Sequence, residues 1–235
     1  MKRVNNSFTI LAVFVIAAGF FSACSSVSSD ATVDASAVGN VKPALPTIPS
    51  RTFALTDFGA VGDGRTLNTD AFKKAIAAVD RAGGGKLIVP KGIFRTLSFA
   101  LCSSLDLHLD EGAVIQAPDT FEGFGLPDPS TLHSQDEVRA RVVTPTPLIT
   151  GNNLHDVAIT GTGTIDGNGA LWWAWSERAA RAQPGRLVYR RPNLVVISRC
   201  QRLHVADITL TNSSMFHLVP QIGRASCRER VFRAV

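Results

Sequence analysis

The sequence predicts an all-β solenoid that opens with one helix. A glycine-rich turn, a helix with one apolar face and a glycine stop follow one another between residues 57 and 92. From residue 86 onward, nine short segments with apolar alternation or β-branched residues predict strands separated by turns. One strand pattern recurs 46 residues later, with Ile159 and Val205 in equivalent positions. A coil of this kind cannot bury its inner face alone, so the coils must stack on one another.

The helix is predicted from its turn, its cap and its stop. Glycines at 59, 62 and 64 indicate a tight turn before it, and glycines at 83–85 end it. Either Asn68 or Thr69 can cap its first turn, where Asp70 also suits the helix dipole. Apolar residues recur at three- and four-residue spacing and form one face: Phe72, Ala75, Ile76 and Val79. This face predicts a helix that lies against the first coil.

The strands are expected to be short and regularly spaced. Two coils of about 23 residues would account for the offset of 46 residues between the repeated patterns. Polar and glycine-containing stretches at 151–153 and 211–214 are predicted to be turns between strands. The predicted strands are 86–89, 93–97, 105–109, 113–116, 157–160, 164–166, 194–197, 203–205 and 208–210.

Two insertions interrupt this regularity. Residues 121–147 contain prolines, mixed charges and little periodicity, and residues 171–192 place three tryptophans beside five arginines. Both are predicted to be long loops that project from one face of the stack, because loops on the surface of a solenoid are free to lengthen.

The first residues predict an exported protein. Lys2 and Arg3 precede an apolar run of 14 residues at 8–21, which suits a signal peptide and is short for a membrane span. The stretch 21–24 is similar to a bacterial lipobox, so we expect a signal peptide at 1–23 and a lipid on Cys24, which would anchor the protein to a membrane. Ordinary cleavage near Ala23 with a free Cys24 thiol is the alternative. Residues 24–51, rich in Ser, Ala, Val and Pro, predict a flexible tether.

The last residues break the strand pattern abruptly. Residues 222–231 can be encoded by codons that resemble a common sequencing adapter, so 222–235 are expected to be a non-native tail after a natural sequence that runs to about Gln221. A genuine basic tail is the alternative.

Charge and metal-ligand spacing restrict the partners. Without the six basic residues and one acidic residue of the leader and the tail, the 24 basic and 19 acidic residues become 18 of each. A neutral body predicts no nucleic-acid partner. The histidines at 108, 133, 155, 204 and 217 show no zinc spacing, so no metal or cofactor is expected. Cys102 and Cys200 are expected to be free thiols, although their pairing cannot be read from sequence.

Three later segments carry a family resemblance, together with the cap at 57–92. Residues 159–169 contain a Gly-x-Gly-x-Ile-Asp-Gly-x-Gly run, which Trp172 and Trp173 follow. Arg191-Pro192 opens the next coil, and 212–220 is similar to an Asn-Ser-Pro-x-Trp/Phe-x-x-x-Pro segment, with Ser214 in place of the usual proline. The chain from about residue 52 to 220 resembles the polygalacturonase family, glycoside hydrolase family 28. The resemblance implies a right-handed parallel β-helix, of which 52–221 would be the N-terminal cap and first coils.

The resemblance also implies a reaction and a partner. Family members hydrolyse galacturonic acid linkages of pectin with inversion, using aspartates that lie in Asn-Thr-Asp and Asp-Asp segments. No segment of this kind occurs in the coils up to Pro220, so the catalytic residues are expected beyond it and this truncated chain is expected to be inactive. Asn68-Thr69-Asp70 has the right letters but lies in the cap helix. The expected partner is a pectic polysaccharide, and the protein is expected to be a monomeric outer-membrane lipoprotein or periplasmic.

Four residues are candidates for the site. Trp172 and Trp173 could stack on sugar rings or pack their insertion onto a coil, and His217 could line the cleft or lie beneath it. Asp166 stands between glycines, where a structural turn role is favoured over a catalytic one.

Two other function classes share parts of this pattern. A pectate lyase would need calcium-binding acids and a base, and the segments at 159–173 and 212–220 argue against it. A non-catalytic β-helix adhesin or tailspike would share the cap.

Overall fold

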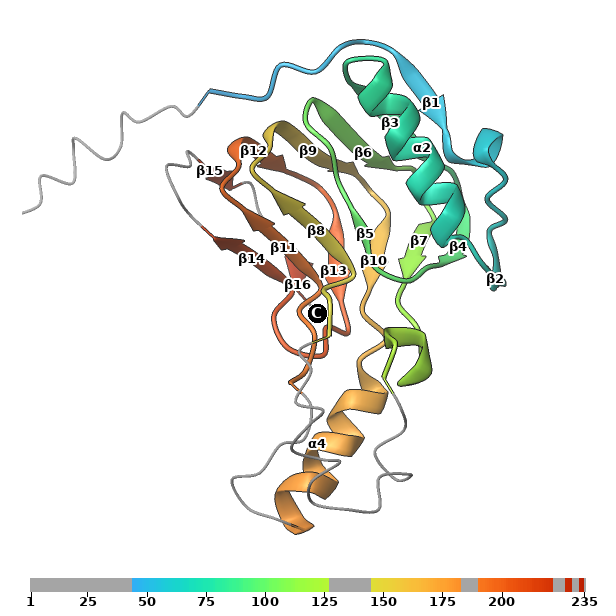
Figure 1. Ribbon diagram of the computed structural model, residues 1–235, viewed down its shortest axis with the longest axis vertical. Helices are drawn as coiled ribbons and strands as arrows, with labels where there is room; N and C mark the ends of the chain where they lie inside the picture. The colour runs from blue at the N-terminus through green and yellow to red at the C-terminus, as the bar shows by residue number, and fades with distance from the viewer. Residues whose placement is uncertain (1–43, 127–144, 183–189, 222–226, 230–232, 235) are drawn as a thin grey trace, which may run out of the picture. The chain divides into compact units, whose positions relative to one another are not determined.

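Parallel strands in three sheets wind around one apolar interior (Figure 1). The computed structural model describes residues 44–126, 145–182, 190–221, 227–229 and 233–234. The chain divides into Met1–Val41 and the unit Lys42–Val235, and only the second contains described residues. The predicted signal peptide and Cys24 therefore lie outside the described residues. Within those ranges, no helix is long and apolar enough to span a membrane.

Each of the four central coils adds one strand to each sheet in succession, and the first and last described coils add strands to two sheets only. The first sheet has the order β1 (Thr52–Ala54), β3 (Gly85–Val89), β6 (Leu105–Leu109), β9 (His155–Gly161), β12 (Gln201–Val205) and β15 (Cys227–Glu229). The second sheet holds β2 (Asp63–Leu67), β4 (Gly92–Arg95), β7 (Ala113–Gln116), β10 (Thr164–Asp166), β13 (Thr209–Thr211) and β16 (Arg233–Ala234). The third sheet holds β5 (Phe99–Ala100), β8 (Ile149–Asn152), β11 (Val195–Ser198) and β14 (Leu218–Gln221).

These pairings make a parallel β-helix. Every strand pairing among the described residues is parallel, and neighbours in each sheet come from successive coils. Crossovers between parallel strands are right-handed in nearly all proteins. The structure confirms the predicted all-β solenoid. The non-native origin of 222–235, which includes β15 and β16, stays a prediction.

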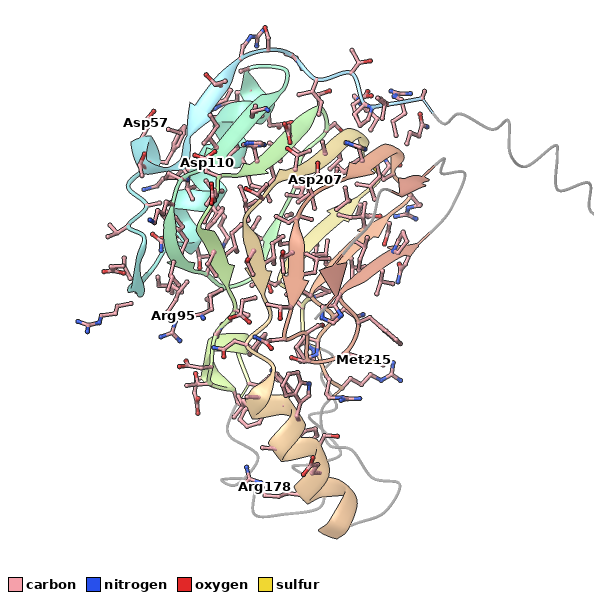
Figure 2. The ribbon with its side chains drawn as sticks, turned by 180° about the vertical axis from the view of Figure 1, so that it is seen from behind. Asp57, Arg95, Asp110, Arg178, Asp207 and Met215 are labelled. Carbon is pink, nitrogen blue, oxygen red and sulfur yellow. The ribbon has the colours of Figure 1, made fainter. Side chains whose placement is uncertain are left out.

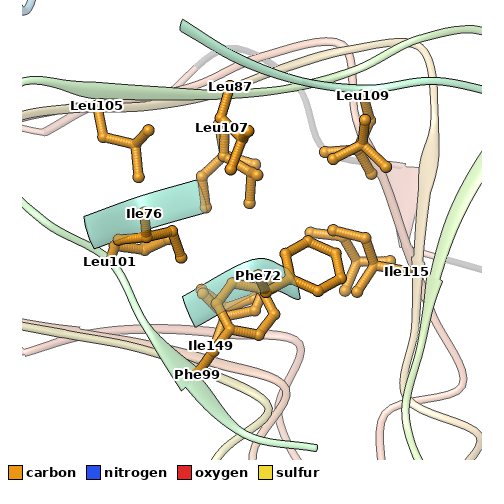
Figure 3. Close-up of a cluster of buried hydrophobic side chains, with 14 of the residues drawn as sticks. Phe72, Ile76, Leu87, Phe99, Leu101, Leu105, Leu107, Leu109, Ile115 and Ile149 are labelled. Carbon is orange, nitrogen blue, oxygen red and sulfur yellow. The ribbon is translucent and has the colours of Figure 1, made fainter. Parts of the chain in front are cut away.

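The interior consists of ladders of apolar side chains in register. Leu87, Leu107, Ile159 and Val205 pair in sequence across four coils of the first sheet, and all four are buried. Figure 3 shows the cap end of this core, where aliphatic side chains of the first sheet face Ile115 of the second. Each fully buried leucine stabilises the fold by about 1.5–3 kcal/mol relative to an exposed one.

The predicted cap helix is α2 (Thr69–Arg81). Its predicted apolar face is buried, and Phe72 stacks on Phe99 at a ring-centroid distance of 4.6 Å. It therefore covers the first coil, as expected. A short 3-10 helix, η1 (Leu55–Phe58), precedes it.

The predicted cap hydrogen bonds are wrong. Asn68 stands at the N-cap position but makes no side-chain cap bond. Its Oδ1 instead accepts from the Val61 N–H at 2.7 Å, and its Nδ2 donates to the Val61 and Thr66 carbonyls. Thr69 Oγ1 accepts from the Leu97 N–H at 2.8 Å. Both side chains fasten irregular backbone next to the helix, because such backbone has no ladder partner for its polar groups.

The predicted coil length also needs correction. Val205 pairs directly with Ile159, so the 46 residues between them form one coil rather than two. That coil is long because it contains the insertion after β10. Residues 151 and 152, predicted to be a turn, belong to β8, and the turn begins at Asn153 with φ of 58°.

The insertion at 171–192 contains a helix, not the predicted loop. The helix α4 (Ala170–Ala182) starts directly after the Gly-rich turn that follows β10. Of the other predicted loop, the structure describes residues 121–126 and 145–147; the former include the short η2 (Glu122–Phe124), and 127–144 lie outside the described residues.

Candidate functional site

The candidate site lies where the loops leave the second sheet for the third. These loops follow β4, β7, β10 and β13 and carry both predicted insertions. Figure 2 shows Arg95 and Met215 at this end of the second sheet, whereas Asp110 and Asp207 lie at the opposite end. We call this end the loop edge. It brings together the segments at 166–173 and 212–217, whose first residues are 46 apart in sequence.

Asp166 holds the turn at the end of β10. Its Oδ1 accepts from the Asn168 N–H at 2.9 Å and from Asn212 Nδ2 at 3.0 Å. Its Oδ2 accepts from Gln116 Nε2 at 3.2 Å. Both oxygens are therefore used to join three consecutive coils, which supports the structural role that the sequence favoured.

Two glycines let neighbouring coils approach closely at this turn. The N–H groups of Gly167 and Gly169 donate to the Thr211 and Asn212 carbonyls at 2.9 and 2.8 Å. A Cβ at either position would lie 2.6 Å from the Asn212 carbonyl oxygen. These two glycines of the family-like run are thus required by close backbone contact between coils.

Trp172 packs the insertion onto the coils. Its side chain is fully buried in a cluster with Phe121, Leu126 and Trp175. Its ring meets those of Phe121 and Phe124 edge to face at 5.1 and 5.2 Å. A fully buried ring favours the packing alternative for Trp172, and its role in substrate binding stays an untested prediction.

Trp173 lies on the exposed side of the same helix. It is 40% exposed, and its Nε1 donates to the Ser213 carbonyl at 3.3 Å. Met215 and Phe216, in the loop after β13, are 46% and 57% exposed. The indole is therefore attached to a loop that presents two further large apolar side chains, and such a surface suits the apolar faces of sugar rings.

The loop at 212–217 is held by its own polar groups. Ser213 Oγ donates to the Phe216 carbonyl at 2.8 Å, and Asn193 Oδ1 accepts from the Phe216 N–H at 3.3 Å. Ser214, which stands where the family pattern has proline, is buried. These bonds fix Phe216 beside the start of the next coil. Asn193 was not among the predicted site residues, although its position directly before a predicted strand was an available signal.

His217 immediately precedes β14. Its carbonyl accepts from the Val195 N–H at 3.0 Å, and its ring Nε2 is buried without a hydrogen-bond partner in the described part of the chain. The backbone bond ties this position to β11. A role in substrate binding stays a prediction.

A narrow hollow lies between these segments. Ala117, Gly167, Asn193 and Ser213 are among the residues that line it, and its volume of about 10 Å³ gives room for about one water molecule. Across the described ranges, no three His, Cys, Asp or Glu side chains form a group that could hold a metal ion. Cys102 is a free thiol, so it forms no disulfide with Cys200.

Comparisons with known proteins agree with the sequence motifs. Residues 127–226 match the model of Glycosyl hydrolases family 28. A probable polygalacturonase of Vitis vinifera is 39% identical over 177 residues, which are 73% of this chain and 34% of that protein. The chain belongs to glycosyl hydrolase family 28.

Other family relatives share both sequence and fold with this family 28 chain. The exo-poly-alpha-D-galacturonosidase of Dickeya chrysanthemi is 32% identical, over 76% of this chain and 35% of that protein. The crystal structure of a hyperthermoactive exopolygalacturonase from Thermotoga maritima aligns with a TM-score of 0.60 at 29% identity, over 80% of this chain and 47% of that one. The chain spans about a third of the length of the curated relatives that it matches.

Proposed function

We propose that the full protein is a pectin-degrading hydrolase of polygalacturonase type. The observation that carries the proposal is the loop edge, where the two family-like segments at 166–173 and 212–217 lie side by side and expose Trp173, Met215 and Phe216. The names of the relatives from Vitis vinifera and Dickeya chrysanthemi support a polygalacturonate substrate.

The proposed reaction is hydrolysis with inversion. One carboxylic acid protonates the leaving glycosidic oxygen while a carboxylate takes a proton from the attacking water on the other face of the sugar. Such a pair stands roughly 6.5–9.5 Å apart so that the water fits between base and sugar. We place both acids beyond Pro220, since Asp166 uses both oxygens in its turn.

The test is cleavage of polygalacturonate by the product of the complete gene. We expect new reducing ends, no unsaturated sugar product and no loss of activity with a calcium chelator. Unsaturated products that disappear with the chelator would identify a lyase instead. Binding without any cleavage would favour an adhesin. The 235-residue chain alone is expected to release no reducing ends above background.

Two candidate substrate contacts belong to this proposal. Trp173 is exposed beside Ser213, and His217 stands at the start of β14. Replacing Trp173 with alanine should weaken binding of an oligogalacturonate by about tenfold, since stacking aromatic contacts contribute about 0.5–1.5 kcal/mol beyond burial. Equal affinity of the variant and the parent would remove Trp173 from the binding surface.

We also propose that the protein is exported, anchored through a lipid on Cys24 and monomeric. The leader with Lys2 and Arg3 and the lipobox-like stretch before Cys24 support the anchor. Expression with a labelled fatty acid tests it: label should appear in the parent protein and be absent from Cys24→Ser. Label in neither would leave ordinary cleavage near Ala23.

A further inference from the structure

We propose that a hollow beside the cap binds the carboxylate of an acidic sugar. The hollow, which we call the cap hollow, has a volume of about 160 Å³ and is lined by the ends of β2 and β4 and by the turn after β7. The proposal rests on the proposed function for its ligand, because polygalacturonate carries a carboxylate on every sugar.

Strands β2 and β4 each contribute one arginine to the lining of the cap hollow. Arg65 lies in β2 and Arg95 ends β4, and both residues line the hollow. Phe94 is buried in the interior, so strand alternation directs its neighbour Arg95 to the outer face. Leu67 pairs with Arg95 across the two strands.

Both arginines are positioned by carboxylates. Asp63 Oδ1 accepts from the backbone N–H groups of Arg65 and Thr66 at 2.8 and 2.7 Å, and these bonds hold the β2 backbone that carries Arg65. The same contacts, chiefly that from the Thr66 N–H, lower the pKa of Asp63 from 3.8 to about 2. Arg95 forms an ion pair with Asp119 through Nη2. A guanidinium has five N–H donors, so this contact leaves Arg95 able to bind a second acceptor.

The lining selects for a sugar that carries a negative charge. Two arginines and one aspartate leave one net positive charge on the lining itself, and the Asp63 carboxylate lies next to it in β2. Arginine binds carboxylates through paired, charge-assisted hydrogen bonds. Leu67, 56% exposed, and Pro118 give the hollow an apolar wall for the C–H face of a pyranose ring. A neutral sugar would use the wall but not the charges.

The cap hollow also lies on the same edge as the loops around Trp173. Arg95, Gln116, Asp166 and Thr211 are in register along the second sheet, one residue from each successive coil. Neighbouring strands are about 4.8 Å apart, so three steps carry this row roughly 14 Å along the stack. A polysaccharide that follows the loop edge would therefore reach the cap hollow within a few sugars.

The experiment is a binding titration of the full chain with digalacturonate, with the neutral disaccharide galactobiose as the comparison ligand. Chemical shifts or calorimetry would measure affinity for the parent, Arg65→Gln, Arg95→Gln and the matched control Arg81→Gln. Arg81 is exposed at the end of α2. Its replacement by glutamine removes one positive charge, as the hollow variants do, but at a position that does not line the hollow. Thermal unfolding of each variant checks that it folds.

We expect each hollow variant to weaken digalacturonate binding about tenfold, in line with a charged hydrogen bond. The control should change affinity less than twofold, and galactobiose should bind weakly to all four proteins. Equal losses for Arg65→Gln and Arg81→Gln would reveal nonspecific charge attraction and overturn the proposal, as would unchanged binding by both hollow variants. If Arg95→Gln fails to fold, the exposed Arg65 still decides the outcome.

The result is independent of the proposed hydrolysis. Reducing-end release by the complete gene product reports on the reaction, and the titration reports on the cap hollow. If the complete gene product cleaves polygalacturonate and the hollow variants bind digalacturonate as the parent does, only the proposal for the cap hollow is rejected. If binding depends on the arginines but no cleavage is seen, the proposal for the cap hollow stands and the proposed hydrolase activity is rejected.

Discussion

Cys102 is a free thiol whose surroundings oppose its ionisation. Burial, and secondarily the negative charge of Asp80, raise its pKa from 9.0 to about 11. At pH 8 only about one thiol in a thousand would be thiolate, against roughly one in four for an unperturbed cysteine with a pKa of about 8.5. We expect iodoacetamide to modify Cys102 at least 100-fold more slowly than free cysteine at pH 8. Peptide mass mapping over time measures the rate, and modification as fast as in urea-unfolded protein would contradict this environment.

Two glycines with positive φ allow the cost of backbone strain to be measured apart from the cost of a steric clash. Gly161 has φ of 100°, and a Cβ there would lie 2.0 Å from the Leu109 carbonyl oxygen. Gly59 has φ of 89° but no atom within 4 Å of such a Cβ. Gly59→Ala should therefore cost about 1–2 kcal/mol of unfolding free energy from the left-handed backbone alone. Gly161→Ala must also push two coils apart, so we expect a larger loss of unfolding free energy, measured by urea unfolding. Equal losses for the two variants would show that the coils can move apart at little cost.

At the scale of elements, the first-sheet strands β3, β6, β9 and β12 and the cap helix were predictable because their signals are local. The apolar face of α2 and the alternation in β6 follow directly from side-chain periodicity. The helix α4 was not predictable in this way. Its 13 residues would be marginal as an isolated helix, and its tryptophans and arginines gave no clear apolar stripe. Docking of Trp172 and Trp175 on Phe121 stabilises it, and that contact joins segments about 50 residues apart.

Adjacent tryptophans of α4 should therefore differ in their effect on stability. Trp172→Ala removes a fully buried ring and should lower the free energy of unfolding by about 3–5 kcal/mol, measured by urea unfolding. Trp173→Ala, at a half-exposed position on the next residue, should cost less than about 1 kcal/mol. A reversed order would mean that the insertion docks through Trp173 instead.

At the scale of the whole unit, coil length was the feature that sequence could not supply. Ile159 and Val205 were correctly recognised as equivalent, yet only their direct pairing shows that one coil separates them. The turn role of Asp166 was predictable from its flanking glycines. The burial of Trp172 was not, because it depends on a loop from the preceding coil.

A second long-range contact ties the entering chain to the coils. The Thr47 N–H donates to Asp156 Oδ1 at 2.8 Å, a contact across 109 residues. Arg202, on the next coil, donates to both oxygens of Asp156 at 2.5 Å, and His155 Nδ1 lies 3.0 Å from Oδ2. The Asp156 side chain is only 7% exposed. One buried carboxylate thus holds the end of the predicted tether and two successive coils together.

Asp156→Asn should therefore loosen the entering chain and destabilise the unit. We expect a loss of about 2 kcal/mol at pH 7, because a buried charged hydrogen-bond network loses its anion. Cleavage after Arg51 by trypsin should also become faster, since Thr47 is released from the coils. Asp207→Asn is the matched control: Asp207 is exposed and, like Asp156, has a positive φ, at 61° and 56°.

The same contact sets a pH dependence with a definite sign. The Arg202 guanidinium holds the pKa of Asp156 well below its usual range, so as pH falls the unfolded chain takes up this proton first. The stabilisation is fully present above the unfolded pKa of about 3.9 and is lost as pH drops from there toward the folded pKa. Parent and Asp156→Asn should therefore differ by a constant amount from pH 7 to about pH 5 and converge below about pH 4. Urea unfolding at each pH measures this difference, and a gap that persisted undiminished at pH 2 would show that the Asp156 charge does not hold the entering chain at Thr47.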